Sequence, residues 1–356
     1  MNARPGLRAL VLTTIGALAV TACGGTSDRP VAAEPASSPA LTATPAGTVV
    51  PAGGDGPEGV VISSDGTLVV AVRDPGALVF SRLAADGSTT TPLGTVETPS
   101  SARHLDLATP TGPVLAPLED SSELLAVDVG TRTITSTATH VGTTPHNAAR
   151  TADGTDVVTN EHGGGVLFVR DGAVVGSLPA GPPQPGGLAV VGRYAAVADV
   201  QGNGVWVYDA SARTQVTHRA LGALLTHAIT LAPAGALDGT GAQRGVVAFA
   251  DTSGGAVELE RITPQVQDTG RVAAPGRPYG LAYDAARTLL YVTLTATNRL
   301  RVVDVADPAR PRVLADLPTV RQPNSVAVDP RSGTVIVTGS VDNVLELIPR
   351  SVLPGT

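Results

Sequence analysis

Short apolar runs separated by turn residues recur along the chain from residue 57 to residue 348. In the first unit the runs are 60–62, 68–72 and 78–81, with Asp-Gly and Pro-Gly turns between them. Such turns between β-branched runs predict hairpins. No window keeps a helical period, and 41 glycines with 29 prolines suit a turn-rich chain. The pattern therefore predicts an all-β protein.

The units repeat roughly every 40 to 52 residues. Seven inner-strand starts align, and we call their first residues the lead residues. These are Glu58, His104, His146, Gly186, His227, Tyr279 and Asn324. Proline precedes five of the seven. Because four short strands per unit at this period are typical of propeller blades, we expect a seven-bladed β-propeller with four-stranded antiparallel blades.

The seventh unit lacks an evident outer strand. Only 349–356 follow its third run, so we expect 47–50, just ahead of the first unit, to supply that strand. Joining the two ends of the ring in this way would protect an exposed sheet edge. A strand at 350–353 is the competing possibility.

The first residues predict export. Two arginines precede an apolar run at 9–20, which is too short to span a bilayer, so 1–22 is predicted to be a secretory signal. The box Val20-Thr21-Ala22-Cys23 resembles the lipobox of bacterial lipoproteins. This resemblance implies acylation of Cys23 and a lipid anchor at the cell membrane, with the protein outside the cytoplasm.

Residues 23–46 are rich in Gly, Ser, Thr, Ala and Pro, and predict a flexible tether ahead of a propeller at 47–356. Cys23 is the only cysteine, so the chain forms no internal disulfide and offers no other thiolate ligand. The net charge is −7, and no basic cluster is present. We therefore expect no nucleic-acid partner. We also expect a monomeric protein.

Three of the six histidines are lead residues: His104, His146 and His227. Inner strands of a propeller start around one central channel, so these imidazoles are expected to be neighbours. Neutral imidazole nitrogens suit zinc, copper and nickel, and three of them with a carboxylate or water form a tetrahedral zinc site. The sequence predicts a zinc site at one mouth of the channel.

Turns after the second strands lie at the same face and offer completing groups. Glu119 and Asp251 are the candidates for a fourth ligand. His162 is either a further nitrogen ligand or a turn residue, with the turn favoured. Glu58 is a candidate for orienting an imidazole N–H from behind.

Two family resemblances extend this interpretation. The stretch Pro278-Tyr-Gly-Leu-Ala-Tyr-Asp, followed by Thr288-Leu-Leu-Tyr-Val-Thr, resembles the YVTN-type propellers of bacterial surface and secreted proteins. That likeness covers roughly residues 57–348 and implies a fold rather than an activity.

The stretches Ala102-Arg-His104-Leu-Asp, Thr144-Pro-His146-Asn-Ala and Thr226-His227-Ala-Ile resemble exported zinc metallochaperones of the AztD type. The resemblance implies zinc capture, without catalysis, and handover to the solute-binding protein of a metal ABC importer. That family's His-rich N-terminal motif and Cys pair are missing here. The resemblance therefore supports metal binding more than this particular delivery.

Two alternatives stay open. Pro57-Glu58-Gly59-Val60 and Pro323-Asn324 resemble gluconolactonase-type hydrolases, which hold Ca²⁺ with oxygen ligands. Those enzymes have six blades, and three histidines are the wrong ligands for a hard cation. The other alternative is an interaction scaffold without a small ligand, because this fold hosts many functions.

Overall fold

The computed structural model describes residues 1–2, 34–202, 204–232 and 244–354. The chain divides into two units, Met1–Pro30 and Val31–Thr356, and the propeller lies in the second. The predicted signal peptide, apart from its first two residues, and Cys23 lie outside the described residues.

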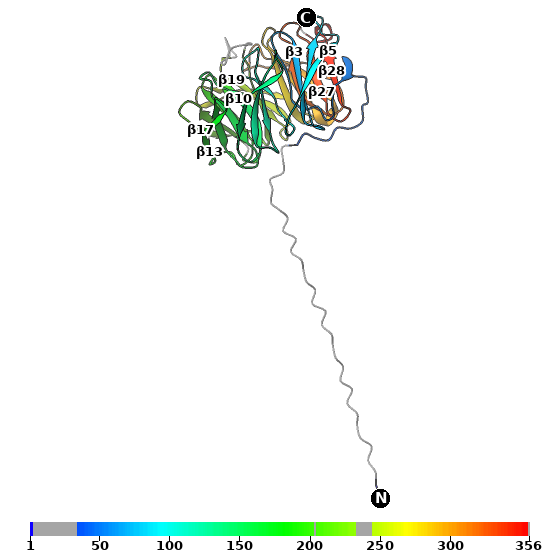
Figure 1. The fold of residues 1–356 in the computed structure, drawn as a ribbon. Helices are drawn as coiled ribbons and strands as arrows, with labels where there is room; N and C mark the ends of the chain where they lie inside the picture. Colours follow the sequence, from blue (N-terminus) through cyan, green and yellow to red (C-terminus); the bar gives the residue numbers. More distant parts are fainter. Residues whose placement is uncertain (3–33, 203, 233–243, 355–356) are drawn as a thin grey trace. The chain divides into compact units, whose positions relative to one another are not determined.

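Seven antiparallel sheets of four strands each make up the described part of the second unit, and they form the blades of a propeller (Figure 1). The predicted fold class is confirmed. Blade one comprises β2 (Val60–Ile62), β3 (Thr67–Val72), β4 (Ala77–Leu83) and β5 (Thr90–Glu97). Blade two comprises β6 (Asp106–Leu107), β7 (Val114–Leu118), β8 (Glu123–Asp128) and β9 (Thr133–Thr139). Blade three comprises β10 (Pro145–Arg150), β11 (Asp156–Asn160), β12 (Val166–Arg170) and β13 (Ala173–Leu178).

The remaining blades follow the same order, from the channel outward. Blade four comprises β14 (Pro185–Val191), β15 (Tyr194–Asp199), β16 (Gly204–Asp209) and β17 (Thr214–Ala220). Blade five comprises β18 (Leu225–Thr230), β19 (Val246–Asp251), β20 (Ala256–Ile262) and β21 (Val266–Ala273). Blade six comprises β22 (Pro278–Asp284), β23 (Leu289–Leu294), β24 (Arg299–Asp304) and β25 (Arg312–Pro318). Blade seven comprises β26 (Pro323–Val328), β27 (Val335–Gly339), β28 (Val344–Ile348) and β1 (Thr48–Pro51), and two 3₁₀ turns are η2 (Thr295–Thr297) and η3 (Arg350–Val352).

Burial along each blade explains its sequence pattern. Second strands such as β3 and β19 are buried at every residue because neighbouring blades cover both of their faces, and they are almost entirely apolar. Outermost strands such as β9 meet solvent and are rich in threonine. The apolar side chains gather in clusters between adjacent blades. The core is therefore a ring of interfaces around the channel.

The first and last blades share one of these clusters, in which Ile62 and Leu68 pack with Ile336 and Leu347. Figure 1 shows β3 and β5 beside β27 and β28. At the outer edge β1 pairs antiparallel with β28, with Thr48 opposite Leu347. Residues 350–352 form the turn η3 rather than a strand. The chain thus closes its own ring.

Gly47 makes this closure sterically feasible. A Cβ at Gly47 would lie 2.3 Å from the carbonyl oxygen of Leu347, so the backbones approach too closely for any side chain. The Gly47 N–H also donates to the carboxylate of Glu346 at 2.7 Å.

We expect Gly47→Ala to lower the free energy of unfolding by about 2 kcal/mol, because the added methyl group must push β1 away from β28. Gly130→Ala is the matched control, since a Cβ there would meet only the carboxylate of Asp128 at 3.5 Å. Urea denaturation followed by circular dichroism measures both. Equal effects of the two substitutions would contradict the role given to Gly47.

Candidate functional site

The inner strands carry a register shift where the lead residues stand. It falls between Pro145 and Ala148 in blade three, and recurs at the corresponding place in blades four, six and seven. A bulge removes its residues from the regular ladder and re-aims their side chains. In blade three the freed N–H of Asn147 is bound by the hydroxyl of Thr159 at 3.0 Å. In the same way, the N–H of Gly280 donates to the hydroxyl of Thr293, and the N–H of Ser325 donates to the hydroxyl of Thr338.

Glycines beside the lead residues let neighbouring inner strands come into backbone contact. A Cβ at Gly187 would lie 2.6 Å from Cα of His227. A Cβ at Gly280 would lie 2.8 Å from the carbonyl oxygen of Asn324. These contacts narrow the ring at the mouth, and so bring lead residues of different blades together.

The structure brings the three predicted histidines into one cluster. The ring centroid of His104 lies 4.4 Å from that of His146 and 4.6 Å from that of His227. His227 in turn meets the ring of Tyr279 at 4.2 Å. All four side chains are buried. His104 and His227, more than 120 residues apart in the chain, are thus in contact at the mouth, as the repeat predicts.

His104 and His227 are neutral, and each has a ring nitrogen without a hydrogen bond to the part of the chain that the structure describes. Nε2 of His104 and both ring nitrogens of His227 are buried without a hydrogen-bond partner among the described residues. Burial lowers the pKa of His227 to about 3, and the nearby charges of His146 and Arg103 add to this effect. Burial, with the same neighbours, holds the pKa of His104 well below its usual value. Neutral imidazole is the form that binds metal ions.

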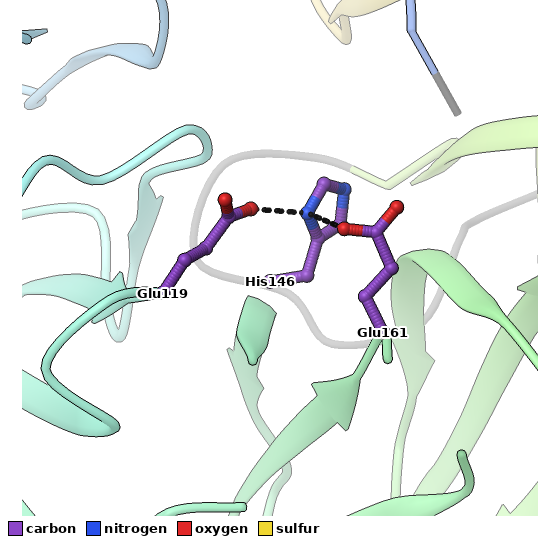
Figure 2. A group of neighbouring side chains, drawn as sticks. All are labelled: Glu119, His146 and Glu161. Carbon is purple, nitrogen blue, oxygen red and sulfur yellow. Dashed lines mark hydrogen bonds and ion pairs between the residues drawn. The ribbon is translucent and has the colours of Figure 1, made fainter. Parts of the chain in front are cut away.

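His146 is held between two carboxylates, as Figure 2 shows. Its Nδ1 lies 2.7 Å from Oε1 of Glu119 and 3.2 Å from Oε2 of Glu161. Burial alone would lower the pKa of His146, but the charges and hydrogen bonds of Glu161 and Glu119 raise it to about 9. Although burial opposes ionisation of Glu161, His146 keeps the pKa of that carboxyl well below its usual value.

Among the described residues, Glu119, His146 and Glu161 form a group of three potential metal ligands close enough together to hold one ion. Their potential ligand atoms all lie within 4.8 Å of one another. Glu161 is absent from the sequence-based ligand set. It stands directly after the second strand β11, as Glu119 stands directly after β7, so its place in the repeat was an available signal.

The other predicted residues have different partners. The carboxylate of Asp251 accepts N–H groups of Ala223, Leu224 and Gly254, and so links the loop before β18 to the turn after β19. Nδ1 of His162 lies 3.2 Å from the hydroxyl of Thr144, which fits the favoured turn interpretation.

Glu58 faces arginines. Its carboxylate pairs with Arg73 at 2.7 Å and with Nε of Arg103 at 3.4 Å. Arg103 is a second residue that the sequence analysis missed, and its side chain is only 8% exposed. It occupies the place before a lead residue where five other blades have proline, which was the available signal.

A cavity of about 740 Å³ leads to the cluster along the channel. It is lined by inner-strand side chains, largely apolar ones such as Leu105, Ile229 and Leu281, and it reaches His104 and His227. Ligand pockets of proteins have volumes of roughly 300–1,000 Å³. The two imidazoles with free nitrogens therefore stand at the inner end of a cavity of ligand-binding size.

Comparisons with known proteins support the fold alone. No protein-family model and no curated protein matches the chain. A hydrazine synthase chain of Kuenenia stuttgartiensis is similar in structure, with a TM-score of 0.66 and 17% identity over 84% of this chain and 96% of its own. A virginiamycin B lyase from Staphylococcus aureus has a TM-score of 0.63 and 13% identity, over 84% and 98%. The β-propeller domain of Myceliophteria thermophila Cps50 (Swd1) has a TM-score of 0.66 and 10% identity, over 82% and 96%.

The protein is therefore a seven-bladed β-propeller with a buried histidine and carboxylate cluster at one mouth of its channel. The YVTN and AztD resemblances stay predictions. Within the described ranges, no helix is long and apolar enough to cross a membrane.

We expect the ring protons of His146 and His227 to titrate far apart in chelator-treated protein. His146 should stay protonated until the pH approaches about 9, and His227 should stay neutral until it falls to about 3. Glu161→Gln should lower the pKa of His146 by at least about one unit, because it removes the larger of the two carboxylate contributions. NMR titration measures this. A pKa of His146 near 6.5 in the unaltered protein would contradict the charged arrangement.

Proposed function

We propose that this protein binds a divalent transition-metal ion, zinc in the first place, at the histidine cluster. The observation that carries the proposal is the set of buried imidazole nitrogens of His104 and His227 without partners, beside His146 held by two carboxylates. A buried polar atom without a partner costs about 1–3 kcal/mol. A bound ion would remove this cost and uses the neutral form that both imidazoles already have.

The balance of charge also favours a cation. Four carboxylates and two guanidinium groups act on one another around the cluster; they are Glu34, Glu58, Glu119, Glu161, Arg73 and Arg103. Their excess of negative charge is two units. A proton on His146 compensates half of that excess, and a divalent ion would compensate all of it.

The ligand types fit zinc. Imidazole and carboxylate are both common zinc ligands, and the cluster offers both kinds. A carboxylate at Nδ1 of His146 fixes the orientation of its ring, as in carboxylate–histidine–zinc arrangements, and leaves Nε2 for an ion. Glu119 and Glu161 are thus placed either to ligate directly or to orient His146. Calcium prefers cages made of oxygen ligands, so the histidines disfavour the gluconolactonase-type alternative.

The role that we propose is capture and handover rather than catalysis, carried out outside the cytoplasm by a protein anchored through Cys23. The lipobox supports this location, and the AztD-like stretches around the three histidines support handover to the solute-binding protein of a metal importer. If instead the chain is an interaction scaffold without a small ligand, the stripped protein will take up no zinc.

Zinc uptake tests the proposal directly. We expect chelator-stripped protein to bind close to one zinc ion per chain in isothermal titration calorimetry, with elemental analysis as a second readout. His146→Ala should weaken zinc binding at least about 100-fold, because it removes a ligand and leaves Glu119 and Glu161 without the imidazole that they contact. His140→Ala, at an exposed position outside the cluster, should bind as the unaltered protein does.

Two results would overturn the proposal: a stoichiometry near zero, or an affinity that His146→Ala leaves unchanged. Glu161→Gln keeps the shape of the side chain and removes its charge. We expect it to weaken zinc binding about tenfold to 100-fold. Calcium-dependent lactone hydrolysis that is lost in Glu58→Gln would support the hydrolase alternative instead.

A further inference from the structure

The segment ahead of β1 lies across the mouth where the cluster stands. Residues 34–46 belong to the predicted tether, yet they are hydrogen-bonded to the propeller at several points. Glu34 contacts Arg103 of blade two, whereas Ser38 and Pro39 contact blades six and seven. Near its other end the N–H of Ala46 donates to the carbonyl of Pro318 at 3.0 Å. The segment therefore connects opposite sides of the ring.

Arg103 provides a site for a carboxylate. Its two terminal nitrogens donate to the two carboxylate oxygens of Glu34, at 2.9 and 3.0 Å. Glu58 lies behind the guanidinium group and pairs with its Nε. A planar guanidinium binds both oxygens of a carboxylate at once, a geometry that a lysine ammonium does not offer. The Arg103 side chain is 8% exposed and that of Glu34 is 56% exposed. The guanidinium group is therefore held in place by its surroundings, whereas the carboxylate that it binds is accessible to solvent.

Side-chain amides recognise the backbone of the segment. Nε2 of Gln322 donates to the carbonyl of Ala36, and Oε1 of Gln322 accepts the N–H of Ser38, both at 2.9 Å. Nδ2 of Asn298 donates to the carbonyl of Pro39 at 2.9 Å. Contacts of this kind depend on an extended backbone rather than on particular side chains.

The propeller also contacts the side chain of Ser38. The Ser38 hydroxyl donates to the carbonyl of Thr295 and accepts the N–H of Gln322 at 3.1 Å, and Ser38 is 6% exposed. The recognised features are thus a carboxylate, an extended backbone and a small hydroxyl four residues after the carboxylate. The segment has no bulky apolar anchor in this stretch. A ligand held by such contacts is exchangeable.

We propose that the channel mouth is a peptide-docking surface that the chain's own Glu34–Pro39 segment fills in cis. The partner that fits it is an extended protein segment with a Glu-x-x-x-Ser-Pro spacing, which would displace the chain's own segment. This inference does not depend on metal binding. Where both proposals hold, docking of such a partner replaces the chain's own segment and places the partner beside the ion.

The test uses the full chain in the presence of a chelator, and a fluorescently labelled peptide with the sequence of residues 34–41. The unaltered protein should bind this peptide weakly, because the cis segment competes at a millimolar effective concentration. The double variant Glu34→Gln/Ser38→Ala weakens the cis contacts and should bind it at least about tenfold more tightly in fluorescence anisotropy. A peptide with Gln in place of Glu should lose at least about tenfold in affinity for this variant.

Two substitutions in the receptor sharpen the test. In the double variant, Arg103→Lys keeps the charge but not the planar fork, and Gln322→Ala removes the amide; each should weaken peptide binding. Thermal unfolding shows whether the variants are folded. Equal peptide binding by the unaltered and double-variant proteins, or equal binding of a scrambled peptide, overturns the proposal. Because chelator is present throughout, failure here leaves the zinc result untouched, and failure to bind zinc leaves this result untouched.

Discussion

Closure of the ring is the constraint on which the rest of the structure depends. Each blade buries its apolar faces only against its neighbours, so an open ring would expose the faces of the first and last blades. The shared cluster around Leu68 and Ile336, and the pairing of β1 with β28, remove that exposed surface. Once the ring is closed, the starts of the inner strands stand at fixed places around the channel. The contact between His104, His146 and His227 follows from this geometry.

The fold could be predicted from sequence because the propeller repeats its local rules. The lead residues mark each blade, and the turns between apolar runs mark each hairpin. The same regularity placed His104, His146 and His227 at one mouth, and the structure confirms that they are in contact. Whether they bind a metal ion is a chemical question that the repeat alone does not answer.

The partners of individual side chains could not be predicted in the same way. A side chain that stands one or two residues earlier or later in its blade meets different neighbours. Glu161 reaches His146, whereas Asp251, also at the end of a second strand, accepts N–H groups from its own turn and from the loop before β18. Arg103 replaces a proline, and no rule of patterning gives the direction of its guanidinium group. The composition of 34–46 predicts a tether, yet Arg103 and Gln322 bind this segment through its backbone and one carboxylate. Amino-acid composition reflects side-chain hydrophobicity and does not predict hydrogen bonds to the backbone or to a single carboxylate.

The glycines beside the lead residues have a consequence for substitutions at the mouth. At Gly187 and Gly280 one inner strand touches the backbone of the next, so the spacing of these inner strands is set by main-chain contact rather than by side-chain packing. That spacing should persist when a lead side chain is exchanged. The position of the inner strands and the chemistry of the lead side chains are therefore separate properties of this propeller, and each can vary without the other.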